Sequence, residues 1–333
     1  MIDKEKYLRD LQGQVQAARQ QHDEGVSAFR AATAGEAAEK ALEQVVSLTE
    51  EDDVRKAMQI FRNPQETPRF RALALTKALN GLADRPEFVR DCLSVVADRT
   101  EPAALRASVF GTLSTLSFFS RAFVALRSDY MSLLRKLLDD PEESIRAMAA
   151  EALAKDKDEY VQRKLLDGLS GRGPLIVSEA KAVQLLGYDI HAEHFPLVRE
   201  LLQKAATEDI TKLEAIHILA NDPEARPLLI NLWKDKRQDK EIRMSSAGAI
   251  QSGDPQAFLP LAKSMVLDET EHAELRAACL SALTVMHHHD DAPLREDEHF
   301  SNGIARLHDA TTLPELKKLT SRFLENVTRR SAK

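Results

Sequence analysis

One pattern recurs along most of this 333-residue chain, at intervals close to 33 residues. Each copy begins with an apolar residue followed by a slot that usually holds arginine, and small or apolar residues stand four and seven positions after the slot. A fixed period of this length is the signature of a repeated supersecondary unit. The apolar residues and their slots are Phe70-Arg71, Leu105-Arg106, Ile145-Arg146, Val177-Ser178, Ile210-Thr211, Ile242-Arg243 and Leu275-Arg276, with a weaker eighth copy at Leu316-Lys317.

Each unit also contains a second apolar run upstream of the slot, such as Leu133–Leu138. Apolar residues three and four positions apart indicate amphipathic helices, and breakers such as Asp140-Pro141 and Gly173-Pro174 separate the two runs of a unit. One pair of helices cannot bury both of its apolar faces by itself. Stacking of unit on unit buries a continuous core, so the pattern predicts an all-α chain of stacked hairpins.

The pattern resembles the HEAT repeats of armadillo-like proteins, on the arginine-containing second helix of each pair. The resemblance extends from about residue 50 to 327 and is clearest between 140 and 286. It implies an α-solenoid of about seven to eight HEAT-like helical hairpins with an N-terminal helix. We expect residues 1–40 to form that N-terminal helix (a cap or an oligomerisation element) and a hinge, and residues 41–333 to form the solenoid.

The arginine slots have a structural interpretation. At 100° per residue the slot lies in the middle of the buried stripe, and a buried guanidinium must be paired. The resemblance implies that these side chains stack from repeat to repeat and bond to turn groups and acids. We therefore expect a ladder that is interrupted where Ser178 and Thr211 occupy the slot; its members are Arg71, Arg106, Arg146, Arg243 and Arg276.

A partner-binding face is expected at the positions two, five and nine after each slot, which point away from the buried stripe. These residues are mostly small or apolar, whereas a solvated helix face carries Lys and Glu. We predict that Val183, Leu213 and Ile216 contribute to a concave surface that binds a protein or peptide. A phase error of one residue, or tighter packing of neighbouring helices, is the alternative, and either would bury this face.

Phe118, Phe119 and Phe123 fall within six positions, in the insertion that lengthens the second interval to 40 residues. They form either an exposed aromatic anchor for a partner or the core of an irregular extra helix. The partner-binding prediction includes all three.

The N-terminal segment has a pattern of its own, in which apolar positions are three and four residues apart. This spacing resembles a coiled-coil seam and allows self-association. A helix that caps the first repeat, or lies on the apolar face, is the alternative that we favour, because the seam is short and contains Ala and His. The positions are Leu8, Leu11, Val15, Ala18, His22, Val26 and Phe29.

Composition excludes several classes of function. The net charge of −7 provides no global attraction for nucleic acid, and no apolar run is long enough to span a membrane. The two cysteines, Cys92 and Cys279, are typical of a reduced, cytoplasmic protein. No nucleotide, hydrolase or metalloprotease motif occurs, and we expect no catalytic residue, metal or cofactor. The string His287-His288-His289 is expected to be a solvated helix end.

The sequence thus favours a non-enzymatic protein–protein interaction scaffold or adaptor. The alternative is a HEAT-like enzyme or cofactor-handling subunit, similar to a bilin lyase. That alternative requires a pocket with converging polar groups near the middle repeats, where Ser178 and Thr211 interrupt the arginine ladder.

Overall fold

The computed structural model describes residues 4–33, 35–289 and 297–331, and within them the side chains of 7–33, 35–286 and 297–325. Every regular element in these ranges is a helix, which confirms the all-α prediction. The contacts group the chain into a first unit, residues 1–177, and a second unit, residues 178–333. Each unit is described by itself. The predicted domain boundary after residue 40 falls inside a helix and stays a prediction.

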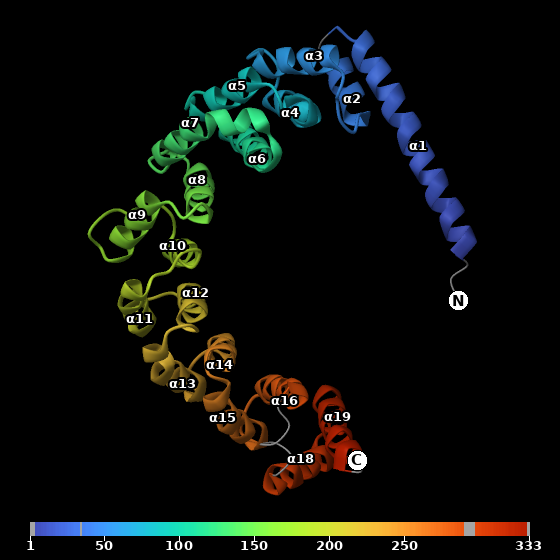
Figure 1. Cartoon of the computed structure of the whole chain (residues 1–333). Coiled ribbons are helices and arrows are strands. Elements are labelled where there is room, and N and C mark those ends of the chain that lie inside the picture. Colours follow the sequence, from blue (N-terminus) through green and yellow to red (C-terminus); the bar gives the residue numbers. More distant parts are fainter. Residues whose placement is uncertain (1–3, 34, 290–296, 332–333) are drawn as a thin grey trace. The chain divides into compact units, whose positions relative to one another are not determined.

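The first unit consists of nine labelled α-helices in its described residues (Figure 1). Their bounds are α1 Lys4–Ala31, α2 Glu36–Gln44, α3 Glu51–Arg62, α4 Pro68–Leu82, α5 Pro86–Ala97, α6 Ala103–Phe119, α7 Arg121–Leu137, α8 Glu143–Lys155 and α9 Glu159–Leu169. Helices α2, α4, α6 and α8 contact one another in succession, while α3 packs on α4, and α5 packs on both α6 and α7. The arginine slots of this unit therefore lie on one row of neighbouring helices.

The second unit repeats this arrangement (Figure 1). Helices α10, α12, α14, α16 and α19 contact one another in succession, and α11, α13, α15 and α18 each pack on a member of that row. The bounds are α10 Glu179–Leu186, η1 Ala192–His194, α11 Phe195–Gln203, α12 Asp209–Leu219, η2 Pro223–Ala225, α13 Arg226–Lys234, α14 Lys240–Gly253, α15 Pro255–Leu267, α16 Ala273–His289, α18 Glu298–Ala310 and α19 Pro314–Ser331.

Many helices begin at a side chain that caps their free N–H groups. Thr67 accepts a hydrogen bond from the N–H of Phe70, and Pro68 follows it at the first helical position. Asp158 and Asp254 cap α9 and α15 in the same way. These residues satisfy donors that a helix N-terminus otherwise leaves unpaired.

The arginine slots tie each hairpin together. The Nε–H groups of Arg71, Arg106, Arg243 and Arg276 donate to the backbone carbonyl ten residues earlier, near the end of the preceding helix, at 2.8–2.9 Å. All four side chains are buried. The predicted burial and pairing of the slot arginines are confirmed at these four positions.

Most of these guanidinium groups also reach an acid in the turn before the next helix of the row. Arg71 binds Glu101 with two hydrogen bonds of 2.7 Å, and Arg243 binds Glu271 at 2.8 Å. Each arginine thereby links its own hairpin to the following one. A buried charge is tolerated here because it is both paired and hydrogen-bonded.

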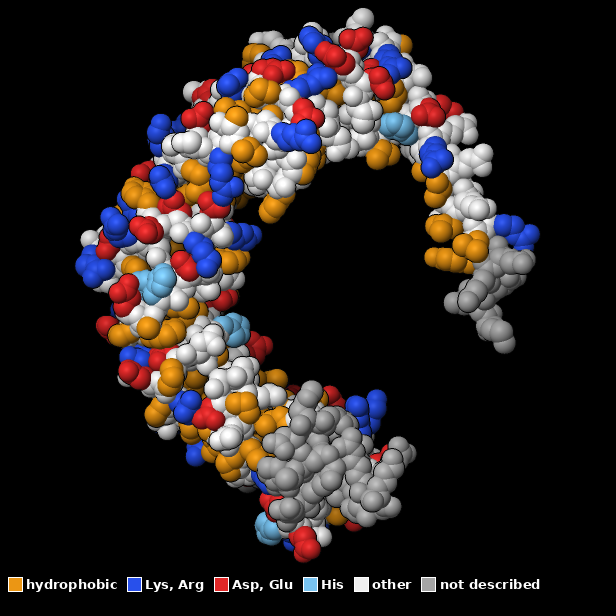
Figure 2. Space-filling view, viewed as in Figure 1, with side chains coloured by type: hydrophobic (Ala, Val, Ile, Leu, Met, Phe, Trp, Pro, Cys, Tyr) orange, Lys and Arg blue, Asp and Glu red, His pale blue; other side chains and the backbone are white. Residues whose placement is uncertain are grey.

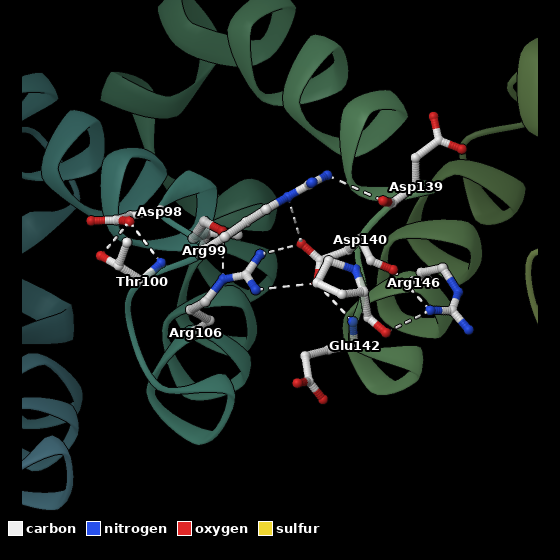
Figure 3. A network of polar contacts seen from close by, with 10 residues as sticks. Asp98, Arg99, Thr100, Arg106, Asp139, Asp140, Glu142 and Arg146 are labelled. Carbon is white, nitrogen blue, oxygen red and sulfur yellow. Dashed lines mark hydrogen bonds and ion pairs between the residues drawn. The ribbon is translucent and has the colours of Figure 1, made fainter.

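The pair between Arg106 and Asp140 is the most buried of these links (Figure 3). Its two hydrogen bonds measure 3.1 and 2.5 Å, and both side chains are buried. Asp140 also accepts from the N–H of Glu142 at 3.1 Å, and Arg99 lies 3.8 Å away. Burial by itself raises the pKa of Asp140, but the hydrogen bonds from Arg106 and Glu142 outweigh it and hold the pKa below its ordinary value.

Arg146 departs from the ladder. It is only half-buried, and its Nε–H donates forward to the carbonyl of Ile176 at 2.8 Å rather than back to the preceding helix. The next two slots carry no arginine: Ser178 caps α10 with its hydroxyl, and Thr211 is buried inside the first turns of α12.

Candidate binding pocket

A pocket of about 420 Å³ opens between α6, α7 and α8 of the first unit, and is called the α6–α8 pocket below. Its floor consists of buried rings. Tyr130 lies edge-on to Phe123 at 4.9 Å between ring centroids and is tilted against Phe110 at 6.4 Å. The side chains of Met131 and Met148 complete the apolar lining. Flexible thioethers adapt to ligands of different shape, so this lining suits an apolar side chain more than a rigid polar group.

The rim of the pocket is charged but internally neutral. Arg127 pairs with Asp156, and Lys155 pairs with Glu151 at 2.6 Å. All four residues line the opening. A charged rim around an apolar centre is the usual anatomy of a protein-binding surface.

Phe118 forms the lip of the pocket and is 89 % exposed. Phe119 and Val124 beside it in the sequence are also exposed. Large apolar side chains this exposed lose free energy in water unless a partner covers them. The end of α6 and the start of α7 therefore carry the strongest signal for a partner in the first unit.

This exposed tip is held in a defined position. Ser120 separates α6 from α7, caps α7 by accepting from the N–H of Phe123, and donates its hydroxyl to the carbonyl of Ala83 at 2.6 Å. The N–H of Ala122 donates to the same carbonyl at 3.2 Å. The turn is thus tied to the end of α4, and Phe118 is presented on a rigid support rather than on a mobile loop.

Burial shifts the pKa values of Tyr130, in the floor of the pocket, and of the two cysteines elsewhere in the chain. Burial raises the pKa of Tyr130, although a hydrogen bond with Ser114 partly offsets that effect. Burial also raises the pKa of the Cys92 thiol far above its usual range and that of Cys279 to about 12. Both thiols stay protonated at neutral pH, so neither supplies a reactive thiolate.

The predicted aromatic residues separate into two roles. Phe118 and Phe119 are exposed, as an anchor requires, whereas Phe123 is buried in the floor of the pocket. For Phe123 the structure shows the core alternative rather than the exposed anchor, because the cap at Ser120 starts α7 in a phase that turns this ring toward Tyr130. Sequence reasoning missed Met131. Met148, Glu151 and Lys155 stand two, five and nine positions after the Arg146 slot, where the partner-binding face was expected, and all three line this pocket. The packing of α7 on α8 adds Met131 to the same lining.

The prediction of an exposed apolar face in the middle repeats was wrong. Val183 and Ile216 are fully buried, and Leu213 is half-buried. In α6 and α14 the buried positions stand three, four, six and seven residues after the slot. In α10 and α12 they stand four, five, seven and eight residues after it. The stripe is displaced by one residue, which is the phase error that the sequence left open.

This displacement exposes polar residues instead. Gln184 and His217, six positions after their slots, line a second pocket of about 280 Å³ together with Tyr188, Glu214 and Asn221. Gln184 donates to Glu214 at 3.4 Å, and the ring of His217 lies 3.9 Å from the same carboxylate. This α10–α12 pocket holds the converging polar groups that the alternative function requires.

Two further predictions concern metals and membranes. Among the described residues, no three His, Cys, Asp or Glu side chains come together as a metal site requires. The side chains of His287, His288 and His289 lie outside the described residues. No helix in the described ranges has the length and apolar character needed to cross a bilayer.

Comparison with known proteins identifies no relative. No protein-family model matches the chain, and no curated protein sequence matches it closely.

Proposed function

We propose that this protein is a non-enzymatic interaction module, built as an α-solenoid of HEAT-like hairpins, that binds a polypeptide in the α6–α8 pocket. Support for the solenoid comes from the succession of contacts among α4, α6 and α8, and among α10, α12, α14 and α16. The recurring ion pairs from Arg71, Arg106 and Arg243 to an acid before the next helix of the row support it further. A row of stacked hairpins offers a long surface to a partner chain.

One observation carries the binding proposal: Phe118 is almost fully exposed at the mouth of an apolar pocket with a neutral charged rim. A pocket of this volume accommodates one or two large apolar side chains of a peptide. Aromatic anchors that become desolvated contribute a large share of the binding energy in protein interfaces. We therefore expect the partner to insert a Leu, Met, Phe or Trp side chain beside Phe118.

Selection from a displayed peptide library against the full chain tests this function. The wild-type protein is expected to enrich peptides with a central apolar residue, and replacement of that residue by alanine should abolish binding. Phe118→Asp should lose these peptides. Val124→Asp is the matched control, because Val124 is exposed at the same tip but does not line the pocket.

Two results would contradict the proposal. Either no peptide is enriched on the wild-type chain, or the enriched peptides bind Phe118→Asp as well as Val124→Asp. Both substituted residues are exposed, so neither variant is expected to unfold. Circular dichroism at 222 nm verifies this.

A second candidate function rests on the α10–α12 pocket. Its amide, imidazole, phenol and carboxylate groups suit a small polar ligand, as the cofactor-handling alternative requires. Native mass spectrometry of the purified chain is expected to show an added mass if this pocket holds a resident ligand. That mass should disappear in Glu214→Ala, and a spectrum of the bare polypeptide alone would count against this function.

A further inference from the structure

The first helix extends far beyond the part of the chain that supports it. α1 has 28 residues, which corresponds to about 42 Å at 1.5 Å per residue. Its C-terminal end is firmly held: Lys56 donates to the carbonyls of Phe29, Arg30 and Ala32, and Arg30 binds Asp53 with hydrogen bonds of 2.7–3.1 Å. Further toward the N-terminus, His22 accepts a hydrogen bond from the N–H of Val46, and Gln21 bonds to Gln44. Residues 7–20, which precede these contacts, are all exposed.

The unsupported part carries a bare apolar stripe. Tyr7, Leu8, Leu11 and Val15 are 44–60 % exposed, and hydrophobic side chains gather along this helix in Figure 2. Leu8, Leu11 and Val15 are spaced by three and four residues, which makes a narrow seam rather than a broad apolar face. A seam of this width fits another helix, whereas burial in a globular core or at a membrane surface needs a wider face.

The same seam is already a helix–helix interface at its other end. Continuing the heptad from Leu8 and Leu11 leads to Gly25 and Phe29, both of which are buried. A Cβ atom on Gly25 would lie 2.8 Å from the Cβ of Gln44 and 3.2 Å from the carbonyl oxygen of Ala41, so α2 packs directly on this position. The nine residues of α2 span about 13 Å and leave the rest of the seam uncovered.

Charge placement along α1 is compatible with pairing between identical helices. In the heptad set by Leu8 and Leu11, Arg9, Asp10, Asp23 and Glu24 fall at the outer positions. Between Tyr7 and Gln21 the positions that flank the seam are uncharged except for Arg19, which faces glutamine in a parallel pair. Two copies therefore meet without like-charge repulsion at their flanks. The uncharged flanking residues are Tyr7, Gln12, Gln14 and Gln21.

We propose that two copies of this chain pair through the N-terminal part of α1. The α1 helix of each copy covers the exposed part of the seam on the other copy, as α2 covers the C-terminal part of the seam within one chain. The pairing also explains why so extended a segment is helical. A helix of this length with a glycine at position 13 is marginal on its own in water, and a partner helix supplies the missing burial. This inference does not depend on the proposed peptide-binding function.

Light scattering coupled to size exclusion, over a series of concentrations, tests the pairing in the full chain. The wild-type protein is expected to approach twice its mass of 37.2 kDa as the concentration rises. The double variant Leu11→Asp/Val15→Asp should remain at the single mass, because two carboxylates then face each other across the seam. Gln16→Asp is the matched control, since Gln16 is exposed and lies outside the seam; it should dimerise like the wild type.

The proposal is overturned if the wild-type chain stays at the single mass throughout the series. A dimer that survives Leu11→Asp/Val15→Asp would also overturn it, because the contact would then lie elsewhere. All substituted side chains are exposed in the single chain, so the urea midpoint of the monomer should not change. An unchanged midpoint ensures that a lost dimer reports on the seam rather than on folding.

Discussion

The hairpins that carry an arginine in the slot differ from those that do not by a rotation of the second helix. In α6 and α14, Arg106 and Arg243 reach back to the preceding helix, and the position five residues later is an exposed glycine, Gly111 or Gly248. In α10 and α12 that position holds Val183 or Ile216, which is fully buried. The buried arginine thus defines which face of the helix packs inward, and without it larger apolar side chains take over that role.

The largest expected effect concerns the arginine link itself. Arg106→Met should destabilise the protein by about 3–5 kcal/mol, because it leaves the buried carboxylate of Asp140 without its partner. Urea unfolding measures this change. The double variant Arg106→Met/Asp140→Leu should recover most of the loss, since it removes both charges. A loss that persists in the double variant would show that the guanidinium contributes mainly by packing.

At the arginine-free slot the expected change is far smaller. Thr211→Ser removes one buried methyl group, which corresponds to about 1 kcal/mol. A loss at Thr211 as large as that at Arg106 would contradict the distinction between the two kinds of hairpin.

The next effect tests the rotation of α12 directly. Ile216→Ala should cost about 2–4 kcal/mol, because the side chain is fully buried in the core. Ser281 occupies the equivalent position, five residues after the slot of α16, and is exposed. Ser281→Ala should therefore stay within about 0.5 kcal/mol of the wild type. Equal losses in the two variants would rule out the one-residue displacement.

The same residues show how much of the structure could be predicted from the sequence. The period and the arginine slots predicted the helices and four of the buried guanidinium contacts, because these depend on local spacing. The rotation of α10 and α12 was also encoded, but in a signal that the repeat pattern obscured. Lys181 and Glu214 stand three residues after the slot, where the arginine-bearing helices have apolar or small residues. Gln184 and His217 stand six residues after it, where those helices have Ala or Thr, except for Lys77 in α4.

The pocket was less accessible to prediction. Phe118 was predicted as a partner-binding residue from the clustering of aromatic residues, but the floor and the walls come from three helices. Met131 and Met148 line the same pocket because α7 packs on α8. No local pattern specifies that geometry.

A pH dependence of moderate size should accompany the arginine links. Asp140 and Glu271 have pKa values below their ordinary 3.8 and 4.5, since hydrogen bonds from arginine outweigh the opposite effect of burial. Their contribution is therefore fully present above the ordinary pKa and is lost as the pH falls through the lowered one. Each unit of lowering corresponds to about 1.4 kcal/mol.

Urea midpoints between pH 7 and pH 2.5 measure this dependence. The wild type should lose stability below about pH 4, and Arg106→Met/Asp140→Leu should lose less, because the carboxyl group of Asp140 with its lowered pKa is absent. Parallel curves for the two proteins would show that Asp140 does not titrate in the way its contacts indicate.

The smallest expected effect has the opposite sign. Gly248 is exposed in the middle of α14, and a Cβ atom added there meets no heavy atom within 4 Å. Gly248→Ala should therefore stabilise the protein by about 0.5–1 kcal/mol, because alanine loses less backbone entropy in a helix. Gly253, at the end of the same helix, is the control: a Cβ atom there would lie 2.1 Å from the carbonyl oxygen of Ala220 in the link after α12. Gly253→Ala should destabilise. Loss of stability in Gly248→Ala would mean that this face of α14 is turned inward, as in α12, and the contrast between the two kinds of hairpin would disappear.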